Sequence, residues 1–429
     1  MDKIIISGGN RLKGSVKISG AKNSALPIMA ATLLTRGSSV IKNIPNLKDV
    51  TTMSYLLVAL GANIIISGDE ITIKCDKIKR SFIHHDLVRK MRASVCLLGP
   101  LLARFGKVEI SHPGGCVIGP RPIDLHLKGL EKLGAQIEMK HGYIIAKSED
   151  GLRGNEIYLG GPLGSTVLGT ANVMMAATLA RGETIIEGAA CEPEIADLAA
   201  FLNAMGAKII GAGTHILRIE GVEELGGAEH TIIPDRIEAG TYLIAVAISG
   251  GDTLLKGARH EHLTAVIDRL EEAGVKIERA PDGLKVKRKN ELKAVNVIAL
   301  PYPGFPTDMQ AQMMSLMSIA KGTSIVADMV YPDRFIHVGE LLRMGANIVR
   351  QGPRATIIGV EKLGGAQVTA SDLRASAALI LAGLAADGET EVSRVYHLDR
   401  GYEKIEEKLS SLGAKIKRVT DKPSGKKKK

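Results

Sequence analysis

Residues 402–417 read Tyr402-Glu-Lys-Ile405-Glu-Glu-Lys-Leu409-Ser-Ser-Leu412-Gly413-Ala414-Lys-Ile-Lys417 and form one of six related segments along the chain. Apolar residues recur three and four positions apart, as on one face of an amphipathic helix. Gly413 follows the last apolar turn, where a left-handed glycine commonly ends a helix. The segment therefore predicts a helix, a sharp stop and a short strand.

The phrase around the glycine recurs at spacings of 68 to 73 residues. A second phrase, an apolar helix end followed by a glycine and a strand, lies 23 to 28 residues before each copy. The period is too long for the common solenoids. The sequence therefore predicts an α/β protein with two globular domains of three units each. The copies are Leu60-Gly61-Ala62, Leu133-Gly134-Ala135, Met205-Gly206-Ala207, Ala273-Gly274-Val275, Met344-Gly345-Ala346 and Leu412-Gly413-Ala414.

Length and composition agree with this organisation. The chain has 429 residues, enough for two hydrophobic cores, and its apolar content of 45% is ordinary for a globular protein. The formal net charge is +10, but eight basic residues and one acid lie between Lys415 and Lys429. We interpret residues 419–429 as a disordered basic tail, and we expect no nucleic-acid partner because no recognition motif accompanies it.

The cysteines and the N-terminus exclude several classes of protein. The four cysteines lack CxxC or Cys/His spacing, so we expect no disulfide framework, metal site or cofactor. The first residues lack the pattern of a signal peptide, and no apolar run approaches the ~18 residues of a membrane helix. We therefore expect a cytoplasmic protein with no membrane partner. The sequence leaves its oligomeric state open.

Polar clusters precede the first helix of each unit. Most of their serine, threonine and aspartate residues are interpreted as helix N-caps. Lys22, Arg92 and Arg374 are different, because a cation near the positive end of a helix is disfavoured. Bound anions at these helix starts would explain the three cations.

One loop carries a cysteine in an unusual setting. Cys116 lies among three glycines and three prolines, close to Arg121, whereas a buried cysteine normally sits in an apolar helix or strand. A thiol in such a loop can titrate and reach a substrate. The residues alone leave open whether Cys116 has a chemical role or is incidental.

These segments resemble the enolpyruvyl transferases, and among them the UDP-N-acetylglucosamine 1-carboxyvinyltransferases. The resemblance spans nearly the whole chain and implies two inverted α/β domains, each with three βαβαββ repeats. It implies that residues 1–21 belong with 233–429, and that 22–232 form the domain with the cysteine loop. The stretches that carry it are Gly20-Ala-Lys22-Asn23-Ser24-Ala-Leu, Pro113-Gly-Gly-Cys116-Val-Ile-Gly, Arg121-Pro-Ile-Asp-Leu-His126, Phe305-Pro-Thr-Asp308-Met-Gln and Asp372-Leu-Arg374-Ala.

The resemblance also implies a reaction. The enolpyruvyl group of phosphoenolpyruvate moves to the 3-hydroxyl of UDP-N-acetylglucosamine, through a tetrahedral intermediate that loses phosphate. Cys116 is implied to be the acid or a transient covalent attachment point, and Asp308 to accept the hydroxyl proton. Such a pair supplies the acid and base that the addition needs. A reactive Cys116 also implies inactivation by fosfomycin-type epoxides.

Binding roles follow from the same resemblance. Lys22, Arg121 and Arg400 are implied to hold the phosphate, and Arg92, Arg334 and Arg374 to neutralise the carboxylate and the developing charge. Asn23 is implied to bind the intermediate. The residues implied to line the uridine and ribose are Arg121, Pro122, Ile123, Asp124, Leu125 and His126.

Two positions depart from the family pattern. Asp333 follows Pro332 where the family has Glu-Asn-Arg, so the carboxylate is shifted by one residue. Thr166 and Val167 are implied to contact the diphosphate, and Leu168 beside them replaces a family glycine.

Two other functions would share part of this sequence pattern. A 5-enolpyruvylshikimate-3-phosphate synthase shares the fold but does not use a loop cysteine. A nucleotide-sugar binder without turnover would have no need for the further arginines.

Overall fold

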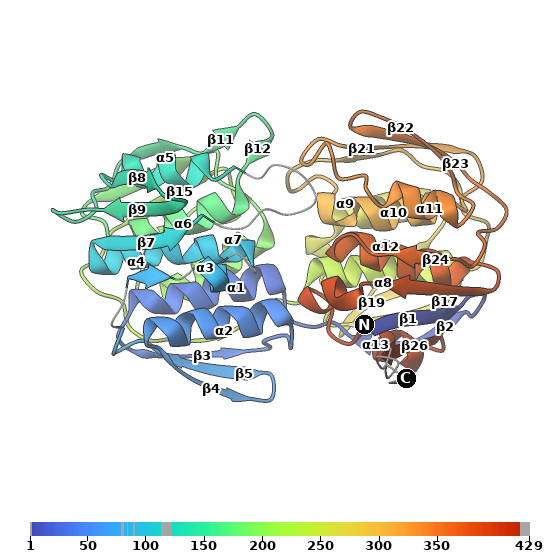
Figure 1. The fold of residues 1–429 in the computed structure, drawn as a ribbon, viewed down its shortest axis with the longest axis horizontal. Helices are drawn as coiled ribbons and strands as arrows, with labels where there is room; N and C mark the ends of the chain where they lie inside the picture. Colours follow the sequence, from blue (N-terminus) through green and yellow to red (C-terminus); the bar gives the residue numbers. More distant parts are fainter. Residues whose placement is uncertain (1, 79–80, 84, 89–90, 113–121, 421–429) are drawn as a thin grey trace, which may run out of the picture. The chain divides into compact units, whose positions relative to one another are not determined.

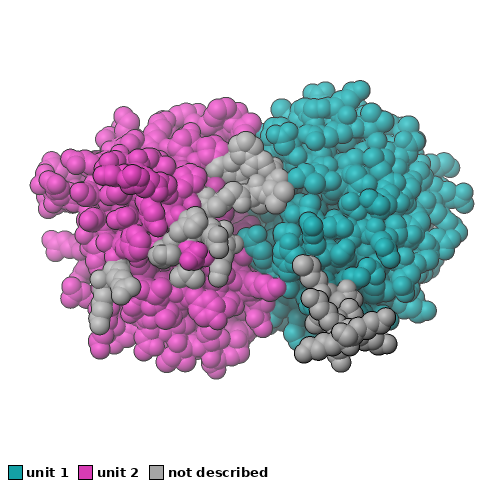
Figure 2. All heavy atoms as spheres, in the orientation of Figure 1, with its two compact units in different colours: residues 1–18, 236–429 teal, residues 19–235 magenta. Residues whose placement is uncertain are grey.

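The computed structural model describes residues 2–78, 81–83, 85–88, 91–112 and 122–420. The chain forms two compact units, each with its own hydrophobic core: unit 1 is Met1–Ile18 with Arg236–Lys429, and unit 2 is Ser19–Asp235 (Figure 2). The two crossings between the units fall three residues from the boundaries expected at 21 and 233. The N-terminal segment is thus part of the C-terminal unit.

Six repeats of one plan make up the described chain, three in each unit (Figure 1). Each repeat has a mostly buried helix, a strand, an amphipathic helix, a hairpin and a last strand. That last strand pairs in parallel with the next sheet. This plan confirms the α/β class.

Unit 2 has β11 (Gly160–Gly161) and β12 (Gly164–Ser165) as an extra pair of strands. Its repeats have the following bounds. The first contains α1 (Lys22–Ala31), η1 (Thr32–Leu34), β3 (Ser38–Lys42), α2 (Lys48–Leu60), β4 (Asn63–Ser67), β5 (Glu70–Lys74) and β6 (Phe82–Ile83). The second contains α3 (His85–Val88), η2 (Arg92–Leu97), α4 (Leu98–Phe105), β7 (Lys107–Ser111), α5 (Asp124–Lys132), β8 (Gln136–Lys140), β9 (Tyr143–Lys147) and β10 (Glu156–Tyr158). The third contains α6 (Val167–Ala177), β13 (Glu183–Glu187), α7 (Pro193–Ala204), β14 (Lys208–Ile210), β15 (Ile216–Glu220) and β16 (Glu229–Thr231).

Unit 1 repeats the same elements. Its first repeat contains α8 (Arg236–Ser249), β17 (Gly251–Lys256), η3 (His260–His262), α9 (Thr264–Glu272), β18 (Lys276–Ala280), β19 (Gly283–Arg288) and β20 (Val297–Ala299). The next contains η4 (Thr307–Met309), α10 (Gln310–Met317), β21 (Thr323–Asp328), α11 (Val338–Arg343), β22 (Asn347–Gln351), β23 (Arg354–Ile358) and β24 (Gln367–Thr369). The last contains α12 (Leu373–Ala385), β25 (Glu389–Ser393), η5 (Val395–Arg400), α13 (Ile405–Ser411) and β26 (Lys415–Thr420), followed in space by β1 (Asp2–Ser7) and β2 (Leu12–Lys17).

The first two strands complete the sixth repeat. Strand β1 lies between β25 and β26, antiparallel to both, and β2 pairs in parallel with β17. In unit 1 the start of the chain therefore links the last repeat to the first, through the pairing of β2 with β17. In unit 2 the pairing of β16 with β3 makes the same link.

The expected start of the basic tail at residue 419 is wrong. Strand β26 continues through Thr420, with Val419 opposite Lys3 and Thr420 opposite Asp2, because the backbone pairs with β1 to that point. The rest of the tail lies outside the described residues.

The mostly buried helices are α1, α4 and α6 in unit 2 and α8, α10 and α12 in unit 1. Helix α6 shows why: its residues Val-Leu-Gly-Thr-Ala-Asn-Val-Met-Met-Ala-Ala are apolar on nearly every face, and such a helix must be enclosed. Figure 1 shows α1 and α2 side by side above β3 to β5. The starts of α1, α6, α10 and α12 carry or directly follow the predicted site residues Lys22, Asn23, Thr166, Val167, Asp308 and Arg374.

The six phrase glycines all have positive φ angles, between 88° and 112°. Gly61 is typical: it ends α2 in the left-handed conformation, and its N–H donates to the carbonyls of Leu57 and Val58. The predicted helix stops are confirmed. Among the described residues, no helix is long and apolar enough to cross a membrane.

Candidate active site

Asp308 lies between two arginines in unit 1. Arg334 Nη1 donates to Asp308 Oδ1 at 2.7 Å, and Arg374 Nη2 donates to Oδ2 at 2.8 Å. The arginine side chains are 7% and 3% exposed, whereas that of Asp308 is 28% exposed. The carboxylate thus pairs with two buried guanidinium groups and is still partly exposed to solvent.

The two arginines fix the charge of Asp308. Burial alone would raise the pKa of its carboxyl, but Arg374 and Arg334 outweigh burial and hold that pKa well below its usual range. Asp308 is therefore ionised at neutral pH. While both arginines remain on it, the carboxylate is a poor proton acceptor.

A buried carboxylate orders the turn that carries Arg334. Asp328 accepts hydrogen bonds from the Thr307 hydroxyl at 2.6 Å and from the Val330 and Tyr331 N–H groups at 3.0 and 2.7 Å. Thr307 Oγ1 in turn accepts from Arg334 Nη1 at 3.1 Å. Burial raises the pKa of Asp328. This residue was missed from the sequence, where it reads only as the end of an apolar strand.

Arg374 is held by its own helix start and by an aromatic ring. Asp372 Oδ1 caps α12 by accepting from the N–H groups of Arg374 and Ala375 at 2.9 and 3.1 Å, as the N-cap interpretation predicts. The Arg374 guanidinium lies 5.4 Å from the centre of the Tyr402 ring. Gln312 ties this ring to the start of α10, since its Nε2 contacts the Tyr402 hydroxyl at 3.3 Å and the Asp308 carbonyl at 2.8 Å.

Two other predicted residues of unit 1 lie in different settings. Arg400 is the last residue of η5. Asp333 is 72% exposed on its side chain and accepts from Arg350 Nη2 at 3.3 Å. The structure therefore joins Asp308, Arg334 and Arg374, while Asp333 pairs with a surface arginine.

In unit 2, Lys22 begins α1 and pairs with a carboxylate from α2. Its Nζ lies 3.2 Å from Asp49 Oδ2, and the side chains are 11% and 6% exposed. Its backbone N–H donates to Asp235 Oδ2 at 3.3 Å. Asn23 follows it and is half-buried. The cation at this helix start thus has a buried counter-ion, which sequence reasoning did not find.

Arg92 supports the segment before α5. It begins η2, and its Nη2 donates to the Pro122 carbonyl at 3.3 Å. Ile123 is buried, Pro122 and Asp124 are exposed and Leu125 is half-buried.

His126 is 4% exposed, and its Nδ1 lies 2.9 Å from Asn172 Nδ2 on α6. Burial, helped by the charge of Arg92, lowers the pKa of His126 to about 3, so the ring is neutral. His126 thus links α5 to α6 through Asn172. Its contact with a ligand stays a prediction.

Thr166 caps α6, with its Oγ1 accepting from the Gly169 N–H at 3.2 Å, and Val167 is the first helical residue. The structure gives Thr166 the capping role typical of a threonine at a helix start. The predicted diphosphate contact of this pair is not tested.

The sequence of the chain matches that of a known protein family over most of its length. Residues 6–409 match the family model of EPSP synthase (3-phosphoshikimate 1-carboxyvinyltransferase). The chain belongs to this family of enolpyruvyl transferases. As a member of it, the chain is an enolpyruvyl transferase by fold and sequence.

Curated relatives match the chain over its length. The UDP-N-acetylglucosamine 1-carboxyvinyltransferase of Methylacidiphilum infernorum is 56% identical, with 98% of this chain and 100% of that one covered. The protein of the same name from Trichlorobacter lovleyi is 54% identical with the same coverage.

Solved structures agree on the fold. The enolpyruvyl transferase NikO of Streptomyces tendae is 25% identical with a TM-score of 0.88, covering 98% of this chain and 99% of that one. EPSP synthase of Acinetobacter baumannii, at 18% identity, has a TM-score of 0.76 and covers 98% and 100%.

Two predicted residues of the transferase, Cys116 and Arg121, lie outside the described residues. The other cysteines are buried. Burial raises the pKa of Cys96 to about 12 and that of Cys75 to about 11, so neither is a thiolate at neutral pH.

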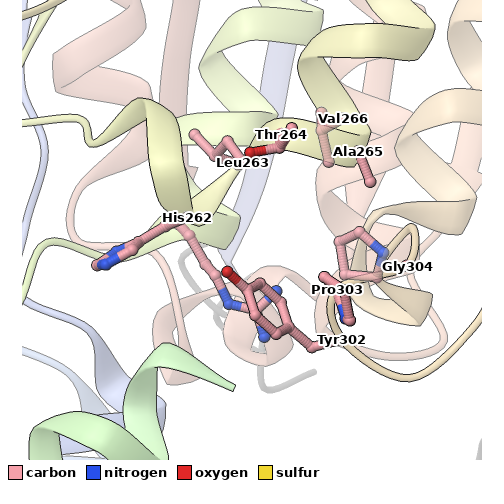
Figure 3. Close-up of a pocket in the computed structure, with 10 residues that line it drawn as sticks. His262, Leu263, Thr264, Ala265, Val266, Tyr302, Pro303 and Gly304 are labelled. Atoms are coloured by element: carbon pink, nitrogen blue, oxygen red, sulfur yellow. The ribbon is translucent and has the colours of Figure 1, made fainter. Parts of the chain in front are cut away.

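A small hollow lies beside the start of η4 in unit 1 (Figure 3). Its walls include His262, the start of α9 and the turn at Tyr302 and Pro303, and Arg236 lies 5.4 Å from the Tyr302 ring centre. Its volume of about 30 Å³ holds a water molecule and no nucleotide sugar.

Proposed function

We propose that this transferase moves the enolpyruvyl group of phosphoenolpyruvate to the 3-hydroxyl of UDP-N-acetylglucosamine, with release of phosphate, as the first committed step of peptidoglycan precursor synthesis. The observation that carries the proposal is the full-length identity of 56% to a curated relative of that activity. A cytoplasmic location and independence from membranes and nucleic acids remain predictions.

The bond changes balance with two proton carriers. A proton adds to the methylene carbon of phosphoenolpyruvate, and the sugar oxygen attacks the adjacent carbon as its own proton leaves. The methyl group of the tetrahedral intermediate then loses a proton while phosphate departs. Cys116 is assigned as the acid or as the attachment point, and Asp308 as the acceptor of the hydroxyl proton.

The charges around Asp308 support this assignment. Its carboxylate is ionised and partly exposed, as a proton acceptor must be, yet Arg334 and Arg374 restrain it. A substrate carboxylate that takes over one of these guanidinium groups would remove part of that restraint and raise the pKa of Asp308. The same arginines can therefore bind the anion and release the base.

The remaining residues have binding roles in this proposal. Lys22, Arg121 and Arg400 bind the phosphate, Arg92 assists the carboxylate pair, and Asn23 contacts the intermediate. The nucleotide-sugar ligands are Pro122, Ile123, Asp124, Leu125, His126, Thr166, Val167 and Asp333.

Phosphate release tests the proposal directly. Purified protein is given phosphoenolpyruvate with either UDP-N-acetylglucosamine or shikimate 3-phosphate, and Cys116→Ala is compared with Cys96→Ala. We expect release with the nucleotide sugar alone, loss of release in Cys116→Ala, and little change in Cys96→Ala, whose thiol is buried. Nucleotide-sugar binding without phosphate release would favour the binder instead.

A further inference from the structure

Arg418 on β26 joins three carboxylates from separate segments of unit 1. Its Nη2 and Nη1 donate to Asp399 Oδ1 and Oδ2 at 2.6 and 3.2 Å, and its Nε donates to Glu406 Oε1 at 2.7 Å. Asp2 Oδ2 on β1 lies 3.6 Å from Nη1. The Arg418 side chain is 23% exposed, and those of Asp399 and Glu406 are 21% and 13% exposed. One partly buried arginine thus balances three acids.

Asp399 directly precedes Arg400 at the end of η5. Val395 and Leu398 anchor one side of this short element in the core, both at 0% exposure. Asp399 is the residue through which the same element is tied to the last strand. A two-pronged arginine–carboxylate pair fixes direction as well as distance. The backbone that carries Arg400 is therefore held by Leu398 in the core and by the pair between Asp399 and Arg418 on β26.

We propose that Arg418 is a positioning residue for Arg400. By donating hydrogen bonds to both carboxylate oxygens of Asp399, it fixes η5 and orients Arg400 towards the phosphate of phosphoenolpyruvate. This inference rests on the proposed function, because it assigns Arg400 to that phosphate. Arg418 itself does not contact the substrate.

Loss of the arginine leaves like charges facing one another. Without Arg418, the carboxylates of Asp399, Glu406 and Asp2 remain as like charges in this cluster, and their mutual repulsion favours movement of η5 away from α13 and β1. The hydrogen bonds to Arg418 also raise its own pKa, so the cation persists at every pH at which the protein is folded. The effect of its removal should therefore fall on the element that bears Arg400.

The test compares Arg418→Gln with Arg269→Gln. Arg269 is a matched control, because it also pairs with two acids, Asp268 and Glu272, but all three lie on α9. We expect Arg418→Gln to raise KM for phosphoenolpyruvate about tenfold, as loss of a charge-assisted hydrogen bond does. Its KM for UDP-N-acetylglucosamine should change less than about twofold, and Arg269→Gln should alter neither constant.

Two further variants keep the inference testable. Asp399→Asn should raise the same KM, and combining it with Arg418→Gln should add little, because both remove one contact. If Arg418→Gln does not fold, Arg418→Lys decides: it keeps the charge but loses the planar fork, and its KM for phosphoenolpyruvate should still rise.

Equal rises in both KM values, or a lower Tm with unchanged KM, would overturn the inference. If the wild type releases no phosphate, the proposed function fails instead. Amide hydrogen exchange then still tests whether the Arg418–Asp399 pair fixes η5. The amides of residues 395–400 should exchange faster in Arg418→Gln than in Arg269→Gln, and equal exchange rates would refute the positioning role.

Discussion

The two units are built from the same repeat but hold charge differently at the starts of their buried helices. In unit 1, two buried arginines share Asp308, whose carboxylate is 28% exposed. In unit 2, Lys22 pairs with Asp49, whose side chain is 6% exposed. In the first group two buried cations share a carboxylate that reaches solvent, whereas in the second a cation meets a carboxylate that is itself buried.

The difference separates two ways of using a cation. An excess of positive charge around an accessible carboxylate can be exchanged for an anionic substrate, so it suits binding coupled to chemistry. Loss of a buried counter-ion instead leaves a desolvated charge behind. We therefore expect substitution of Asp308 to act mainly on turnover and substitution of Asp49 to act mainly on stability.

The largest effect should come from Asp308→Asn. The amide cannot accept the hydroxyl proton, so kcat should fall by about 10²–10⁴, the usual contribution of a general base. Stopped assays of phosphate release measure it, with Asp268→Asn on α9 as a control for an exposed acid. Full activity in Asp308→Asn would end its assignment as the base and with it the contrast between the units.

Asp49→Asn tests the other side of the contrast. It removes the negative charge 3.2 Å from the Lys22 ammonium in a setting only 11% exposed, so the free energy of unfolding should fall by about 3 kcal/mol. Urea unfolding measures the loss. The same change at the exposed Lys276–Glu278 pair, Glu278→Gln, should cost less than about 1 kcal/mol. Similar costs for the two variants would mean that the buried pair is not a stabilising element.

Features set by neighbouring residues could be predicted from the sequence, whereas contacts between residues far apart in the chain could not. The period of Gly61 and its five counterparts predicted the helix stops and the six repeats, because these are set by local backbone conformation. The three cations at helix starts were also visible in the local sequence, but the anion sites predicted from them stay predictions. The sequence did not predict the contacts of Asp49, Asp328 and Asp399, because their partners lie 27, 21 and 19 residues away in sequence. Only folding brings such pairs together. Completion of the sixth repeat by β1 was implied by the resemblance and not by periodicity.

Among the residues that the structure describes, His126 in unit 2 and His337 in unit 1 are buried and neutral, and both should weaken the fold in acid. Burial lowers the pKa of His126 to about 3 and that of His337 to about 4. Both values lie below the pKa of about 6.5 in the unfolded chain. The unfolded state therefore binds more protons, and stability is lost as the pH falls from about 6.5 towards 4.

Each histidine should contribute up to about 1.4 kcal/mol per pH unit to that slope. Urea titrations between pH 7.5 and 5 measure it, and His126→Asn should flatten the curve, whereas His141→Asn at an exposed turn should not. A wild-type slope left intact by His126→Asn would mean that the ring is already protonated in the fold.

The smallest effect is expected where the chain leaves the last sheet. Strand β26 pairs with β1 through Thr420, so deletion from Asp421 onward removes no described backbone pairing. Turnover and Tm should stay within error of the full chain. Deletion from Arg418 onward should behave differently, since it removes three paired residues and the grip on Asp399. A large loss of kcat in the shorter deletion would give the lysine-rich end a role in the reaction. Equal behaviour of the two deletions would instead show that η5 holds Arg400 in place without the last strand.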